Sequence, residues 1–183
     1  MNLQSENQQL DLVIKNISLM TMDLSRPRPY GLIEQASIGI KDGKISWLGK
    51  EAELPAVQAK QIIDGQGQFL SPGLIDCHNH LVFAGSRAHE FEQRLTGVSY
   101  EEIAKQGGGI LSTVHATRNA SEQELLELAL KRARVLMTEG VSSLEIKSGY
   151  GLDTATEIKI LKVARKVGEL LPIEVKTTFL GAH

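Results

Sequence analysis

The sequence has 183 residues, 42% of them hydrophobic, which is enough apolar material for one core or for a small domain joined to part of a larger one. Its 20 basic and 22 acidic residues leave a net charge of −2, which disfavours nucleic acid and anionic lipid as partners. No signal peptide or membrane span is recognisable, and a single cysteine cannot form an internal disulfide, so we expect a cytoplasmic protein.

The first 70 residues predict short strands joined by tight turns, because β-branched and apolar residues recur there in short runs without helical periodicity. The clearest unit is a hairpin that turns at Asp42-Gly43. Its expected buried face consists of Ile38, Ile40, Ile45 and Trp47. A change of pattern at residues 71–73 places a domain boundary near residue 70.

Beyond residue 70 the pattern alternates between strands and helices, which predicts an α/β fold with a parallel sheet or barrel. Strands are expected at residues 74–75, 141–146 and 173–180. Three helices are expected to begin at capping boxes, namely Ser99 with Glu102, Ser121 with Glu124, and Thr154 with Glu157. A complete barrel needs roughly 250 residues, so we expect this chain to be part of a longer protein.

Helical spacing also predicts which faces of the second and third helices are buried. The expected inward residues of the second helix are Leu126, Ala129, Leu130, Ala133, Leu136 and Met137. Those of the third helix, which should end at Pro172, are Ile158, Leu161, Ala164 and Leu171.

Two histidines stand one residue apart, directly after the apolar strand that opens the second part. His78 and His80 are at positions i and i+2, so on a strand they point to the same side and can converge on one ion. Neutral imidazole is a good ligand for zinc, iron and other transition ions. The alternative is that one or both are polar residues at a strand end.

A set of local motifs carries a narrower resemblance. They are Pro-Gly-Leu-Ile-Asp before the histidine pair, Ser86-Arg87-Ala88-His89-Glu90-Phe91, the stretches at residues 97–103 and 107–110, Thr117-Arg118, and residues 145–152. Together they resemble the imidazolonepropionase family of the amidohydrolase superfamily, from about residue 10 to the last residue. This family hydrolyses 4-imidazolone-5-propanoate to N-formimidoyl-L-glutamate in histidine degradation.

The resemblance implies a role for particular residues. His78 and His80 would be ligands of one zinc or iron ion, and Arg87, Tyr150 and His183 would contact the substrate. Arg87 suits the propionate carboxylate, because a guanidinium can bind it bidentately. Tyr100 is a further candidate, although it also suits the first turn of its helix. Lys147 is interpreted as a structural lysine, and His89 and His115 as surface or helix-packing residues.

For the fold, the resemblance implies a small β-sandwich domain followed by a TIM-like (β/α)8 metal-dependent hydrolase barrel. Residues 1–70 would form the first part of the sandwich, and residues 71–183 the first part of the barrel. The remaining ligands, a histidine and an aspartate, and the carboxylate that shuttles protons would come from later strands. The chain alone is therefore expected to lack catalytic residues and to be inactive. The resemblance is also compatible with a homodimer of the complete protein.

Two alternatives remain open. One is another cyclic-amide hydrolase or deaminase of the same superfamily, since the histidine pair is shared widely, and Arg87 and Tyr150 discriminate between them. The other is a non-catalytic fragment.

Overall fold

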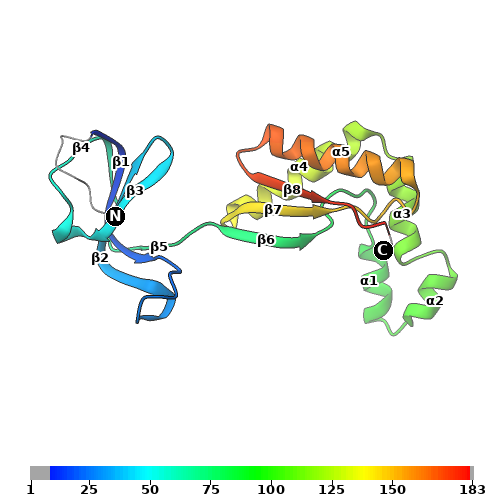
Figure 1. Ribbon diagram of the computed structural model, residues 1–183. Helices are drawn as coiled ribbons and strands as arrows, with labels where there is room; N and C mark the ends of the chain where they lie inside the picture. Colours follow the sequence, from blue (N-terminus) through cyan, green and yellow to red (C-terminus); the bar gives the residue numbers. More distant parts are fainter. Residues whose placement is uncertain (1–8, 182–183) are drawn as a thin grey trace. The chain divides into compact units, whose positions relative to one another are not determined.

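The computed structural model describes residues 9–181 and divides the chain into two compact units, Met1–Pro72 and Gly73–His183. The first unit holds a sheet of five strands, and the second holds a sheet of three strands with five α-helices (Figure 1). This combination confirms the predicted α/β class.

The first unit is built around the long strand β1, which has neighbours on both sides. Its strands are β1 (Gln9–Met20), β2 (Leu32–Lys41), β3 (Lys44–Lys50), β4 (Gln58–Asp64) and β5 (Phe69–Leu70). The order is β3-β2-β1-β4, with β5 also paired to β1. Strand β1 is antiparallel to β2 and parallel to β4 and β5. Short 3-10 turns lie at Pro29–Gly31 and Glu51–Glu53.

The predicted hairpin is present as β2 and β3, with the turn at Asp42-Gly43. Both turn residues have positive φ, 51° and 70°, as a type I′ connection requires. The predicted buried face is only partly correct, because Ile38 is buried but Ile45 is 57% exposed. The reason is that β3 lies at the sheet edge among the described strands, with a neighbour on one side only. The small core is made by Ile17, Leu19, Ile33, Ala36 and Ile38.

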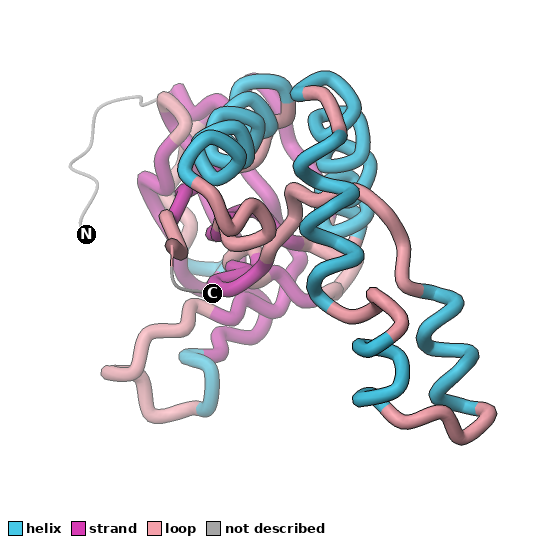
Figure 2. The backbone as a smooth tube through the Cα atoms, turned by 90° about the vertical axis from the view of Figure 1, so that its right-hand side faces the viewer, coloured by secondary structure: helices cyan, strands magenta, loops and turns pink. Residues whose placement is uncertain are grey.

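The second unit contains a parallel sheet in the order β6-β7-β8. Its strands are β6 (Leu74–Asn79), β7 (Val141–Lys147) and β8 (Glu174–Thr178). Its helices are α1 (Ala88–Leu95), α2 (Tyr100–Lys105), α3 (Ile110–Asn119), α4 (Glu122–Thr138) and α5 (Thr154–Leu170). Helices α4 and α5 cover one face of the sheet, whereas α1 and α2 extend away from it (Figures 1 and 2). The sequence analysis did not identify α1 or α3.

One continuous core joins the sheet to α4 and α5. Leu144 and Ile146 on β7 point into it and are at most 1% exposed. The helices contribute Leu125, Leu126, Ala129, Ala133, Ile160, Val163, Ala164 and Val167. The predicted inward face of α4 is confirmed, since its predicted residues are buried or packed against this core. No helix within residues 9–181 combines the length and apolar composition needed to cross a bilayer.

The predicted inward face of α5 is partly wrong. Ala164 is buried as expected, but Ile158 is 47% exposed, and the helix instead buries Ile160, Val163 and Val167. Apolar residues occupy more than one face of α5, so periodicity alone selected a neighbouring stripe.

The helix caps follow two of the three predictions. The backbone N–H of Glu102 donates to Ser99 Oγ at 3.2 Å, at the start of α2. Ser121 and Glu124 form a complete, reciprocal capping box before α4. The third prediction is wrong, because Asp153 rather than Thr154 caps α5 and accepts the backbone N–H of Thr156 at 2.8 Å.

Replacing Ser121 by alanine should lower the free energy of unfolding by about 1 kcal/mol, the usual effect of losing a helix cap. Urea denaturation followed by circular dichroism measures the change. The control is Ser71→Ala, an exposed serine outside any helix start, which should change the free energy by less than half of that. Equal effects of the two substitutions would contradict a capping role.

Candidate functional site

The two predicted metal-binding histidines lie side by side at the end of β6. Their ring centroids are 5.7 Å apart with an interplanar angle of 61°. His78 is exposed and His80 is half-buried. Asp76 ties the end of this strand, because its carboxylate accepts the backbone N–H of His78 at 3.2 Å and the Asn79 side-chain amide at 3.1 Å.

Tyr150, which follows β7, lies against the same pair. Its ring centroid is 5.4 Å from that of His80 and 5.7 Å from that of Phe83. Phe83 in turn stacks on Arg132 of α4, whose guanidinium carbon lies 3.6 Å from the ring centroid. Arg132 also donates to the carbonyls of Leu81 and Phe83 at 3.0 and 2.8 Å. The structure thus brings His78, His80 and Tyr150 into one group at the ends of neighbouring parallel strands.

A polar cluster on β7 and β8 adjoins the histidines. Lys147 Nζ pairs with Glu145 Oε1 at 2.5 Å, and Thr178 Oγ1 donates to the same oxygen at 2.6 Å. The hydrogen bonds from Lys147 and Thr178, together with the positive fields of Lys147 and His78, hold the pKa of Glu145 below its usual value. Lys147 is only 15% exposed in its side chain, and this pairing supports its interpretation as a structural lysine.

Glu145 and Thr178 were not predicted from the sequence as neighbours of the site. Alternation along β7 could have indicated that Glu145 and Lys147 share a face. They alternate with the apolar residues Leu144 and Ile146, which occupy the other face of the strand. Thr178 could not be added in this way, since its place opposite Lys147 depends on the register between β7 and β8.

Arg87 and Tyr100 form a second group, around the three-glycine loop at residues 107–109. Arg87 Nε lies 3.6 Å from the Glu90 carboxylate, whose side chain is 7% exposed. Glu90 Oε1 in turn accepts the backbone N–H of Gly109 at 3.0 Å. Gly109 has a φ of 73°, and a Cβ at this position would lie 3.1 Å from the Tyr100 hydroxyl. Tyr100 is 57% exposed at the start of α2, and His183 lies outside the described residues.

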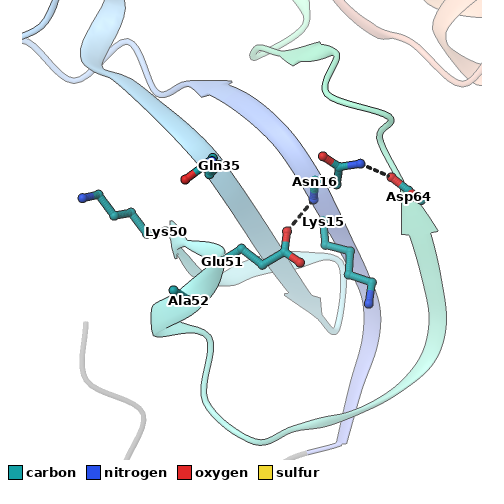
Figure 3. A pocket seen from close by; sticks show the side chains of 7 residues that line it. All are labelled: Lys15, Asn16, Gln35, Lys50, Glu51, Ala52 and Asp64. Carbon is teal, nitrogen blue, oxygen red and sulfur yellow. Dashed lines mark hydrogen bonds between the residues drawn. The ribbon is translucent and has the colours of Figure 1, made fainter.

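Concave regions occur in both units. A mostly apolar groove of about 400 Å³ is lined by Asp76, Asn79, His80, Leu81, Phe83, Arg132, Val135, Leu136 and Glu139. A polar pocket of about 660 Å³ in the first unit is lined by Lys15, Asn16, Gln35, Lys50, Glu51, Ala52 and Asp64 (Figure 3). In it Glu51 accepts the backbone N–H of Asn16 at 2.7 Å, and Asn16 donates to Asp64 at 2.8 Å. None of the predicted site residues lines this second pocket.

The histidine pair fits a shared metal ion. Two imidazoles bound to one ion with metal–nitrogen distances of about 2.1 Å have ring centres roughly 5 to 6 Å apart. The observed separation of 5.7 Å lies in this range. Among residues 9–181, no group of three or more His, Cys, Asp or Glu side chains is close enough to hold an ion. A metal site that included His78 and His80 would require further ligands.

Comparison with solved structures identifies the fold. A 5-methylcytosine deaminase from Klebsiella pneumoniae, liganded with phosphonocytosine, aligns with a TM-score of 0.61 and 20% identity over 90% of this chain and 35% of that protein. An atrazine chlorohydrolase variant from Arthrobacter aurescens TC1, complexed with zinc and atraton, aligns with a TM-score of 0.53 and 19% identity over 91% of this chain and 35% of that protein. At this identity the similarity shows that the chain shares the fold of these two proteins, and it shows nothing about substrate.

Comparison with known sequences is more specific, although no protein-family model matches the chain. An imidazolonepropionase from Shewanella baltica is 58% identical over 175 residues, which cover 94% of this chain and 43% of that protein. The chain thus spans less than half the length of the curated relatives that it matches. It is similar to the imidazolonepropionases over nearly its whole length and corresponds to under half the length of such a protein.

Proposed function

We propose that the complete protein containing this chain is an imidazolonepropionase, which hydrolyses the cyclic amide of 4-imidazolone-5-propanoate to N-formimidoyl-L-glutamate. The observation that carries this proposal is 58% identity over 94% of the chain. The grouping of His78, His80 and Tyr150 at the ends of adjacent parallel strands supports it, because active sites of α/β barrels lie at the carboxyl ends of their strands.

The proposal includes the finer architecture. The strands of the first unit would contribute to a small β-sandwich domain, and β6, β7 and β8 would be the first three strands of a TIM-like barrel. The parallel order β6-β7-β8 and the placement of α4 and α5 on one face support this assignment.

His78 and His80 would hold one zinc or iron ion, together with a histidine and an aspartate outside this chain. The zinc named with the atrazine chlorohydrolase structure belongs to that protein and supports only the class of ligand here. When bound, such an ion supplies a hydroxide nucleophile near neutral pH and polarises the ring carbonyl. Asp76 would hold the turn in which the two imidazoles converge, and Tyr150 would position the substrate beside them.

Arg87 would bind the propionate carboxylate of the substrate. Its Nε lies 3.6 Å from the Glu90 carboxylate, which would help to orient the guanidinium for a bidentate contact with the substrate. Tyr100 and His183 complete the proposed substrate contacts. We also propose a cytoplasmic location, which the free, exposed Cys77 supports, and a homodimer.

Substitution of Arg87 tests the substrate assignment in the complete protein. Arg87→Ala should raise KM for 4-imidazolone-5-propanoate roughly 10- to 100-fold, the usual consequence of losing a charged hydrogen bond. Arg87→Lys should recover only part of the loss, since an ammonium cannot bind a carboxylate bidentately.

The matched control is Arg94→Ala, an exposed arginine on α1, the helix that Arg87 precedes, and it should leave KM unchanged. A KM unaffected by Arg87→Ala would remove this residue from the substrate site. Both outcomes can be measured only if the unsubstituted protein hydrolyses the substrate.

A further inference from the structure

The loop that carries Tyr150 is hydrogen-bonded by two side chains, Glu157 and Arg118, that have no part in the proposed function. It runs from the end of β7 to the start of α5, and Gly149 and Gly151 within it are buried although they flank the partly exposed Tyr150. Its backbone is not relaxed, because Leu152 has a φ of 53°. A non-glycine residue holds such a conformation only when its surroundings determine it.

Glu157 of α5 binds backbone N–H groups of the loop. Its side chain points back to the helix start and is 97% buried, since the residue is 3% exposed. Oε1 accepts the backbone N–H of Gly151 at 2.6 Å and that of Leu152 at 2.9 Å. A buried carboxylate with two short hydrogen bonds to the main chain fixes two successive peptide groups, the first of which follows Tyr150 directly.

Arg118, in the last turn of α3, binds the carbonyl side of the peptide group between Gly151 and Leu152. Its Nε donates to the carbonyl of Gly151 at 2.7 Å and lies 2.9 Å from the Asp153 carboxylate. Asp153 caps α5, and its hydrogen bonds from Thr156 are the main reason that its pKa is below the usual value. The loop is thereby fastened to the end of α3 and to the start of α5.

Gly151 can lie this close to the start of α5 only because it lacks a side chain. A Cβ at this position would lie 2.8 Å from both the backbone nitrogen and the Oε1 atom of Glu157. Lys159 keeps the end of α3 beside α5, because its Nζ donates to the carbonyls of Thr117, Arg118 and Ala120 at 2.7 to 3.1 Å.

From this arrangement we infer that Glu157 and Arg118 form a clamp on Gly151 that positions Tyr150 against His80. The ring centroids of Tyr150 and His80 are 5.4 Å apart, and the clamp acts on the residue next to Tyr150. Glu157 and Arg118 are positioning residues, since they contact the loop and not the substrate. The consequence for substrate binding rests on the proposed function of Tyr150.

The first test measures hydrogen exchange at the Gly151 and Leu152 amides in the complete protein. Glu157→Leu removes the acceptor at similar volume and should speed exchange about tenfold or more, as expected for a lost hydrogen bond to a charged group. Glu157→Gln keeps an acceptor oxygen and should stay near the unsubstituted rate. Glu169→Leu, at an exposed glutamate on the same helix, should have no effect. Unchanged exchange in Glu157→Leu would overturn the clamp.

The second test is a double-mutant cycle on the hydrolysis of 4-imidazolone-5-propanoate. Glu157→Leu should raise KM more than it lowers kcat, and it should have little further effect on KM in a Tyr150→Phe background. Independent, multiplying effects of the two substitutions would show that Glu157 does not act through Tyr150. Should Glu157→Leu fail to fold, Arg118→Met removes the donor on the other side and is subject to the same two criteria.

The two tests separate the failure of the clamp from the failure of the proposed function. A complete protein that leaves the imidazolone intact contradicts the proposed function, while hydrogen exchange still decides whether Glu157 holds the loop.

Discussion

His78→Ala in the complete protein is expected to lose most of its bound metal and to hydrolyse 4-imidazolone-5-propanoate more than about 100-fold more slowly. Loss of a partner that merely orients a metal ligand already costs roughly 10- to 100-fold in metal affinity or activity, so loss of a ligand should exceed that range. The argument depends on the adjacent rings of His78 and His80, whose separation of 5.7 Å suits one shared ion.

Elemental analysis of the purified variant measures the metal, and a substrate-depletion assay measures hydrolysis. His89→Ala is the matched control, because His89 is an exposed histidine on α1. It should retain full metal content and activity. A folded His78→Ala variant that keeps a full equivalent of metal would show that the ion is bound elsewhere.

Ile160→Ala is expected to lower the free energy of unfolding by about 2 to 5 kcal/mol, the range observed for removing a large aliphatic side chain from a core. Ile160 is 1% exposed and packs in the cluster that joins α4 and α5 to β7. Its loss would leave a cavity that Val163 and Leu144, both buried, can fill only in part. Urea denaturation followed by circular dichroism measures the difference.

Ile158→Ala provides the control within the same helix. Ile158 has the same side chain but is 47% exposed, so its truncation should cost well under half as much. Equal losses for the two isoleucines would mean that the face of α5 turned toward Ile158 is also buried in the complete protein.

The regular elements of the fold followed from local signals where those signals were unambiguous. The hairpin at Asp42-Gly43 and the capping box at Ser121 each depend on a few adjacent residues, and both occur as predicted. Helices α1 and α3 were not predicted because their cap residues, Arg87 and Gly109, make no side-chain cap hydrogen bond and so provide no capping motif.

At the start of α5 the sequence correctly predicted a side-chain cap but the wrong cap residue. Thr154 and Glu157 have the spacing of a capping box, but Asp153 is a better acceptor and takes the cap position. Glu157 is thereby released from that role and binds the loop before the helix instead. The preference depends on the path of the loop, which the local pattern does not specify.

Some residues of the candidate site could also be placed from the sequence, and others could not. The proximity of His78 and His80 was predictable from strand geometry, since residues at i and i+2 point to the same side. The position of Tyr150 beside His80 was not, because it depends on how the loop after β7 returns over the end of β6. The roles proposed for Arg87, Tyr100 and His183 rest on the sequence resemblance and stay predictions.

The most direct test of the central claim is turnover of 4-imidazolone-5-propanoate by the metal-loaded complete protein, with product identified by mass spectrometry. The account predicts consumption of the substrate and formation of N-formimidoyl-L-glutamate. A folded protein that binds metal through His78 and His80 yet leaves this substrate intact would contradict the proposed function, although the α/β fold would remain.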